Sequence, residues 1–172
     1  MEYRQLSKRD EKTLNMKNEP FDLFGRLIIE REQNRWIHKE ELFQKKERMT
    51  FPDEKMSIEE IEKKGFAIGA YQEDEIVGLA IFHDDWTKYA YLHDLKVKGS
   101  YRQQGIAGNL IEKGLWQAKK QGYAGLYTIA QDNNLGACRF YLKENFVVGG
   151  LNTHGYNHTA QEGKADIYFY KE

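Results

Sequence analysis

The chain has 172 residues, of which 40% are hydrophobic and 31% are charged, as is typical of one globular domain built around one core. Its 26 basic and 27 acidic residues nearly cancel, which argues against a broad binding surface for nucleic acid or for an anionic membrane. The lone cysteine, Cys138, excludes an internal disulfide, no Cys/His cluster has zinc spacing, and no stretch approaches the ~18 apolar residues of a membrane-spanning helix, so we expect a cytoplasmic protein without a metal site.

The first predicted elements along the chain differ in how well the sequence defines them. Residues 1–6 are predicted to form a short strand, and the apolar segment 21–32 is compatible with either a strand or a helix. The charged segment 38–49 is predicted to be a solvated helix or a loop. Ser57 followed by Glu60 has the form of a capping box, which predicts the start of a short helix.

The middle of the chain has the clearest periodicity. Residues 65–72, 76–83 and 89–97 predict three strands joined by tight turns. Apolar residues then recur at helical spacing, which predicts a helix that begins at Gly105 and ends at Gly122.

The last quarter of the chain alternates strands with one helix. We predict a strand over 123–130, a helix over 133–145 and closing strands over 146–150 and 165–172. No linker or repeat interrupts the order, so residues 1–172 are predicted to form a single α+β domain with a mixed sheet.

Small residues gather where the strand 89–97 leads into the helix. Gly105, Ala107 and Gly108 would expose backbone N–H groups at the positive end of the helix dipole, which suits a phosphate or pyrophosphate. The spacing is neither G-x-G-x-x-G nor that of a P-loop. Taken alone, the stretch is equally compatible with a helix start that binds no ligand.

A second motif, about 30 residues later, narrows the interpretation of this helix start. The segment 102–107 reads R-x-x-G-x-A, and the segment 134–141 reads N-x-x-A-x-x-F-Y. In this order of strand, loop and helix, the two motifs resemble the GCN5-related N-acetyltransferase (GNAT) family. The resemblance implies an α+β fold with a mixed, mostly antiparallel central sheet flanked by helices. It also implies that acetyl-CoA is the cofactor and that an amine accepts the acetyl group.

The resemblance assigns residues to acetyl-CoA. The main chain of the strand before the loop would bind the pantetheine arm, the loop amides would hold the pyrophosphate, Arg102 would steer the phosphates, and Asn134 would bond to the cofactor arm. The family has a glycine where this chain has Asn145, and because asparagine also tolerates the left-handed conformation we expect the helix to end there. The residues assigned to the cofactor are Leu95, Lys96, Val97, Arg102, Gln103, Gln104, Gly105, Ile106, Ala107, Gly108, Asn134, Ala137 and Tyr141.

Direct transfer from a thioester to an amine makes two demands on the enzyme. An alkyl ammonium has a pKa near ~10.4, so its proton must be removed before the nitrogen can attack, and the leaving thiolate must be protonated. The resemblance gives the second task to Tyr141. No enzyme nucleophile is needed, and Cys138 is expected to be a buried structural thiol.

Two neighbouring residues of the strand 89–97 are candidates for the base, either directly or through water. His93 suits proton transfer near neutral pH, and the resemblance adds that several family members that acetylate amines carry Glu or His at this position. Asp94 is the alternative. Strict alternation predicts that the two face opposite sides and that His93 shares its side with Tyr91 and Leu95.

Segments at both ends of the chain carry a closer resemblance. Residues 21–28, 86–97 and 146–153 are similar to the streptothricin acetyltransferases, which acetylate a β-lysine amine. That group tends to have an acidic residue at the position of His93, which leaves the identity of the base open. A small cationic amine would be recognised by carboxylates and aromatic faces. The candidate acceptor residues are Phe21, Asp22, Trp86, Tyr91 and Asp94.

Several alternatives remain at this stage. The acceptor could be a polyamine, another small metabolite or a protein amino group. A non-catalytic acyl-CoA-binding module is a further alternative. We expect no nucleic-acid or membrane partner, and a homodimer is compatible with the family.

Overall fold

The computed structural model describes all residues 1–172, which form two compact units. The first unit contains residues 1–19 and 51–126 together with Glu172, and the second contains residues 20–50 and 127–171. None of the helices is both long enough and apolar enough to cross a membrane. The expectation of a single domain over residues 1–172 stays a prediction.

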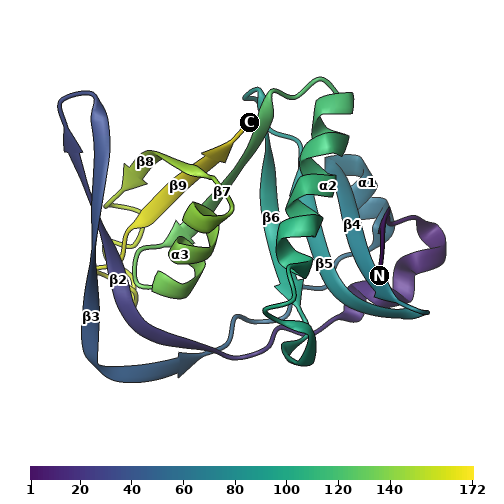
Figure 1. Cartoon of the computed structure of the whole chain (residues 1–172), viewed down its shortest axis with the longest axis horizontal. Helices are drawn as coiled ribbons and strands as arrows, with labels where there is room; N and C mark the ends of the chain where they lie inside the picture. Colours follow the sequence, from purple (N-terminus) through teal and green to yellow (C-terminus); the bar gives the residue numbers. More distant parts are fainter. The chain divides into compact units, whose positions relative to one another are not determined.

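Four antiparallel strands form the sheet of the first unit, in the order β1-β4-β5-β6 (Figure 1). They are β1 (Glu2–Gln5), β4 (Gly65–Gln72), β5 (Glu75–His83) and β6 (Tyr89–Val97). The strands predicted at 1–6, 65–72, 76–83 and 89–97 are therefore confirmed. Residues 66–71 of β4 and 77–82 of β5 are all buried, because helices cover both faces of this sheet.

Helix α2 (Ile106–Lys120) packs on one face of this sheet. The contact is close because glycines stand where the helix meets β5. A Cβ atom at Gly78 would lie 3.0 Å from side-chain atoms of Ile106, and a Cβ atom at Gly114 would lie 2.0 Å from the ring of Phe82. Larger residues at these positions would push the helix off the sheet.

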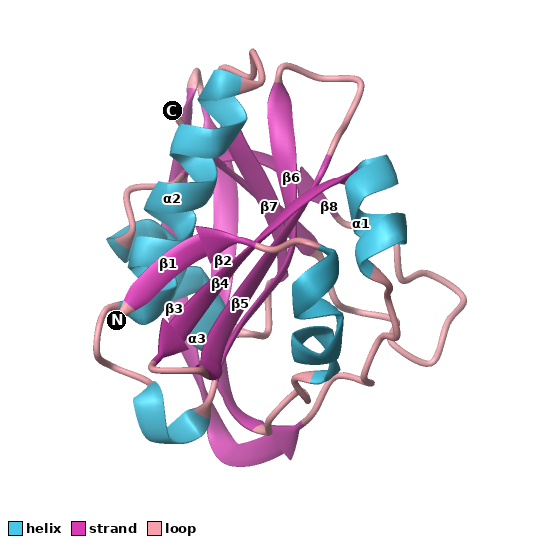
Figure 2. Cartoon of the chain, turned by 90° about the vertical axis from the view of Figure 1, so that its right-hand side faces the viewer, coloured by secondary structure: helices cyan, strands magenta, loops and turns pink.

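The opposite face of the sheet is covered by α1 (Ile58–Lys64) and by the 3-10 helix η1 (Lys8–Asn15), and Figure 2 shows α1 and α2 on opposite sides of the strands. The predicted capping box at the start of α1 is confirmed. The Glu60 N–H donates to Ser57 Oγ at 3.2 Å, and the Ser57 N–H donates to the Glu60 carboxylate at 2.9 Å. The apolar core on this face comprises Leu6, Leu14, Ile58, Ile61, Ala67, Tyr71, Leu79 and Ile81.

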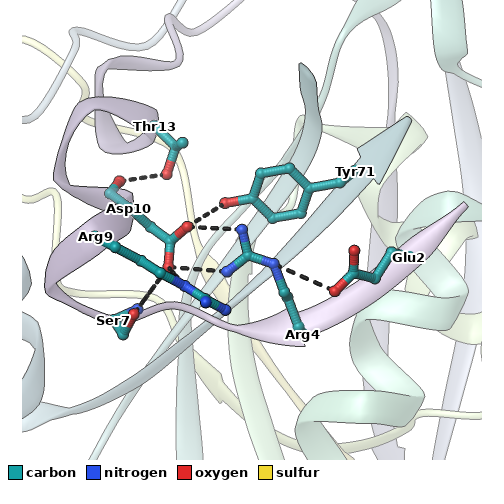
Figure 3. A network of polar contacts seen from close by, with 7 residues as sticks. All are labelled: Glu2, Arg4, Ser7, Arg9, Asp10, Thr13 and Tyr71. Atoms are coloured by element: carbon teal, nitrogen blue, oxygen red, sulfur yellow. Dashed lines mark hydrogen bonds and ion pairs between the residues drawn. The ribbon is translucent and has the colours of Figure 1, made fainter. Parts of the chain in front are cut away.

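A buried carboxylate ties β1, η1 and β4 together (Figure 3). Asp10 is 4% exposed and accepts two hydrogen bonds from Arg4, at 2.7 and 2.9 Å. The Ser7 N–H and the Tyr71 hydroxyl also donate to it, at 2.9 and 3.2 Å. The Arg4 guanidinium holds the pKa of Asp10 well below its usual range, and burial raises the pKa of Tyr71. The carboxylate therefore stays ionised inside the fold.

A long hairpin opens the second unit. Strands β2 (Phe21–Glu32) and β3 (Arg35–Met49) pair antiparallel, which resolves the ambiguity at 21–32 in favour of a strand. The prediction of a helix or loop over 38–49 is wrong, since this segment is part of β3. Almost all of β3 is exposed, so its sequence has no apolar alternation, and pairing with β2 holds it extended.

The rest of the second unit has three neighbouring strands in the order β7-β9-β8 and one helix. The strands are β7 (Gly125–Gln131, which begins in the first unit), β9 (Asp166–Lys171) and β8 (Val147–Asn152), and the helix is α3 (Leu135–Lys143). All four were predicted. Helix α3 packs against β2.

The two long helices end at residues in the left-handed conformation, as predicted. Gly122, just after α2, has φ +91°, and its N–H donates to Lys119 O at 3.1 Å. Asn145, just after α3, has φ +62°. The following Phe146 N–H donates to Tyr141 O at 3.0 Å, which satisfies a carbonyl in the last turn.

Candidate active site

The start of α2 has the properties of an anion site. Gly105 precedes the helix with φ +77°, and no side chain caps the helix. A Cβ atom built at Gly105 would meet nothing within 4 Å, and residues 102–105 are exposed. The first N–H groups of a helix have no partner within it. This uncapped helix start therefore fits the pyrophosphate of acetyl-CoA.

A carboxylate that the sequence did not reveal holds the loop before α2. Glu19 accepts the Gly99 N–H with both carboxylate oxygens at 2.9 Å, and it lies 3.8 Å from the Arg102 guanidinium. Arg102 also donates from Nε to Val97 O at 3.2 Å. Part of the role of Arg102 is thus to tie the loop to the end of β6. No local pattern could have identified Glu19, which is 80 residues before Gly99.

The predicted pantetheine-binding residues form the last part of β6. Leu95, Lys96 and Val97 pair with consecutive residues of β5. Lys96 Nζ lies 2.9 Å from Asp94 Oδ2, with side chains only 12% and 25% exposed. The carboxylate of Asp94 is therefore engaged by an ammonium group.

A β-bulge interrupts β6 at His93. Leu92 pairs with Phe82 and Asp94 pairs with Ile81, so two adjacent residues of β5 face three residues of β6. His93 is the additional residue. Bulges re-aim side chains and are common beside active sites.

The bulge corrects the predicted orientation of the two candidate bases. His93 stacks on His83, with ring centroids 4.3 Å apart, and His83 is two residues from Ile81 on β5. Because alternate strand residues share a face, His93 lies on the same face as Asp94 and not on that of Leu95. The prediction that His93 lies on the same side of the strand as Tyr91 is confirmed, since the two rings meet edge to face with centroids 5.8 Å apart.

His93 has two partners that the sequence analysis missed. Its Nε2 lies 2.9 Å from Glu54 Oε2, and its ring stacks on His83. The His93 side chain is 24% exposed, so part of its ring is open to solvent. The only local signal for His83 was its place at the end of a strand, opposite Tyr91.

The candidate acceptor residues belong to both units. Tyr91 lies beside His93, whereas Asp94 is paired with Lys96. Trp86 is 93% exposed on the turn between β5 and β6. In the second unit, Phe21 and Asp22 begin β2 and pair with the last residues of β3.

The second motif begins α3 in the second unit. Asn134 caps the helix, because its Oδ1 accepts the Ala137 N–H at 3.2 Å, and it pairs with Gly25 of β2. A Cβ atom at Gly25 would lie 2.6 Å from Glu41 O of β3 and 2.8 Å from a side-chain carbon of Leu135, so a larger residue would not fit between β3 and α3. Cys138 is fully buried, as expected, and burial raises its pKa to about 12, which rules out a thiolate nucleophile.

The ring of Tyr141 is held by phenylalanines. Its centroid lies 5.3 Å from that of Phe140, 5.4 Å from that of Phe146 and 5.5 Å from that of Phe169. Packing of this kind fixes the direction in which the hydroxyl points. The chain has no group of three or more His, Cys, Asp or Glu side chains placed to hold a metal ion.

Comparisons with known proteins agree with this arrangement. The model of the acetyltransferase (GNAT) family matches residues 31–146. Streptothricin acetyltransferase A of Bacillus subtilis (strain 168) is 32% identical over 160 residues, which are 92% of each protein. A streptothricin acetyltransferase of Escherichia coli is 27% identical over 116 residues, or 67% of each protein.

Solved structures extend the similarity to the fold. A Bacillus anthracis (strain Ames) structure, assigned as a streptothricin acetyltransferase and crystallised with acetyl coenzyme A, has a TM-score of 0.86 and 26% identity, and the match covers 98% of this chain and 95% of that one. A nourseothricin acetyltransferase has a TM-score of 0.78 at 19% identity. The predicted fold class, a mixed and mostly antiparallel sheet flanked by helices, is confirmed.

Proposed function

Because this chain belongs to the GNAT family and is an acetyl-CoA-dependent N-acetyltransferase, we propose that it acetylates a primary amine of streptothricin and so confers resistance to this antibiotic. The observation that carries the proposal is the 32% identity to the Bacillus subtilis enzyme over 92% of both proteins. That similarity extends well beyond the two cofactor motifs.

We propose that the residues named from the two motifs bind acetyl-CoA. The uncapped start of α2 and the exposed loop before it support a role for the amides of residues 103–108 in holding the pyrophosphate. Leu95, Lys96 and Val97 would contact the pantetheine arm through their main chain. Arg102 braces this loop and would add positive charge near the phosphates. Asn134 and Ala137 would contact the cofactor arm.

The proposed reaction is a direct transfer in which the cofactor supplies an acetyl thioester. His93 accepts a proton from the substrate ammonium, so that the amine nitrogen has a free lone pair. Glu54, 2.9 Å from Nε2 of His93, stabilises the imidazolium that forms. Tyr141 would donate its hydroxyl proton to the sulfur as the carbon–sulfur bond breaks, and the second proton lost by the acetylated nitrogen would restore the tyrosine hydroxyl. The three aromatic neighbours of Tyr141 restrict the rotation of its side chain, which keeps the hydroxyl in one position.

The acceptor residues are proposed from charge and aromatic character. A β-lysine chain carries ammonium groups, which favour carboxylates and ring faces. Tyr91 is the best supported of the candidates because it contacts His93. Phe21, Asp22, Trp86 and Asp94 are retained as candidates whose contribution substitution must decide. Action in the cytoplasm and formation of a homodimer stay predictions.

A panel of amines tests the acceptor. The purified protein is incubated with acetyl-CoA and with streptothricin, an aminoglycoside, spermidine, free lysine or a lysine peptide, and the release of coenzyme A thiol is followed. We expect streptothricin to give the highest kcat/KM. Turnover of spermidine or of the peptide alone would refute the antibiotic as acceptor and would leave the acetyltransferase assignment intact.

A further inference from the structure

Two histidines of the first unit lie face to face. The rings of His83 and His93 have centroids 4.3 Å apart and planes inclined by 19°. Tyr91 meets both rings edge on, at 6.4 Å from His83 and 5.8 Å from His93. Tyr91 also pairs across the strands with His83, so these three side chains form one cluster at the end of β5. The imidazole planes are thereby fixed in a stack.

The two rings differ in their surroundings. His83 Nε2 is buried and has no hydrogen-bond partner, whereas His93 Nε2 lies 2.9 Å from Glu54 Oε2. Burial lowers the pKa of His83, and the neighbouring His93 lowers it further. A positive charge is thus disfavoured on the His83 ring, whereas the His93 ring has a carboxylate within hydrogen-bond distance.

Other charged groups near His83 do not change this balance. Lys64 at the end of α1 lowers the pKa of His83, while Glu54 and Asp84 raise it, and all three contribute less than burial and His93. Two positive charges on stacked rings 4.3 Å apart would repel each other strongly in this partly buried setting. The pair can therefore hold one proton readily and two only with difficulty.

We propose that His83 is a positioning residue that fixes the ring of His93 and restricts the stacked pair to one proton, which His93 holds next to Glu54. This inference rests on the proposed function in so far as His93 is the base. With both imidazoles neutral, His83, His93 and Glu54 together carry one negative charge. Uptake of one proton from the substrate ammonium makes the trio neutral.

This arrangement suits an acceptor that arrives as a cation. A negatively charged trio attracts an ammonium group, and the trio loses that attraction once it has taken the proton. A second proton would instead make the trio positive and would repel the next substrate. Because His83 stays neutral, the trio does not take up this second proton. The His83 ring also keeps one face of the His93 ring covered.

Titration of the imidazole signals by NMR in the full chain tests the coupling without any assay of activity. We expect His93→Gln to raise the pKa of His83, because the neighbouring charge is removed. His38→Gln is the matched control, because His38 is an exposed residue of β3 and is not among the groups that shift the pKa of His83. An unchanged pKa of His83 in His93→Gln would overturn the proposal.

Kinetics then separate the positioning role from the base role. His83→Phe keeps a neutral ring on His93, and we expect kcat within about threefold of the wild type. His83→Ala removes that ring, and we expect kcat to fall about tenfold while the KM for acetyl-CoA stays constant. Equal rates for the two variants would refute positioning by the ring. Full activity of His93→Gln would refute the base role itself, whatever the NMR titration shows.

Discussion

Two glycines at opposite ends of α2 allow the proposed cofactor site to be tested against an internal control. Gly105 has φ +77° and Gly122 has φ +91°, and a Cβ atom at either position would meet nothing within 4 Å. Replacing either by alanine therefore costs only the strain of the left-handed conformation, about 1–2 kcal/mol. We expect Gly105→Ala and Gly122→Ala to lower the free energy of unfolding by similar amounts, measured by urea denaturation.

Binding of acetyl-CoA should distinguish the two variants. A methyl group at Gly105 would keep a phosphate from at least one amide of the helix start, and a lost hydrogen bond to a charged oxygen costs about 1.5–3 kcal/mol. Since each 1.4 kcal/mol is a factor of about ten, we expect Gly105→Ala to weaken acetyl-CoA binding about tenfold or more in titration calorimetry. Gly122→Ala should bind as the wild type does. Equal affinities of the two variants would show that the start of α2 does not hold the pyrophosphate.

Three further predictions follow from the residues described above. Tyr141→Phe should lower kcat by about 100-fold or more, as expected for loss of a general acid, with little effect on stability; unchanged turnover would exclude Tyr141 as the proton donor. Cys138→Ala should keep its turnover number, and the wild-type thiol should react with a thiol reagent only on unfolding, because burial raises its pKa to about 12. Asp10→Asn should destabilise the fold by about 2–3 kcal/mol, because the Arg4 guanidinium loses its buried counter-charge, whereas Glu59→Ala, which breaks the exposed pair with Lys63, should cost under about 0.5 kcal/mol. The pKa of Asp10 is lower in the folded than in the unfolded protein. Its contribution to the free energy of unfolding is therefore complete above the unfolded pKa of about 4 and is lost as the pH falls towards the folded pKa. Equal acid sensitivity of Asp10→Asn and the wild type would contradict this.

Elements with a buried face could be predicted from the sequence, and β3 could not. Apolar residues at a fixed period identify the strands at 65–72 and 76–83 and the helix predicted from Gly105. Strand β3 lacks such a period because nearly all of it is exposed, and only its pairing with β2 makes it a strand. Extended pairing of this kind depends on a partner segment, which a local pattern does not contain.

The candidate site was predictable where chemistry follows from local spacing. The loop at 102–107 and the helix cap at Asn134 belong to contiguous motifs. The orientation of His93 was not predictable, because the bulge depends on the register between β5 and β6. Glu54 reaches His93 from 39 residues away, and nothing in the intervening sequence marks that contact.

The glycine in the middle of α2 has a consequence for how this enzyme can change. Gly114 is nine residues from Gly105, about 13 Å along the helix axis at the usual rise. Because the Phe82 ring occupies the space of a side chain at Gly114, a larger residue there would force the helix and this ring apart. A displacement of α2 at Gly114 would also move the start of the helix, next to the loop that is proposed to hold the pyrophosphate. Substitutions at Gly114 or Phe82 would then change the affinity for acetyl-CoA indirectly, through the position of the helix start, while the residues proposed to bind the cofactor stay the same.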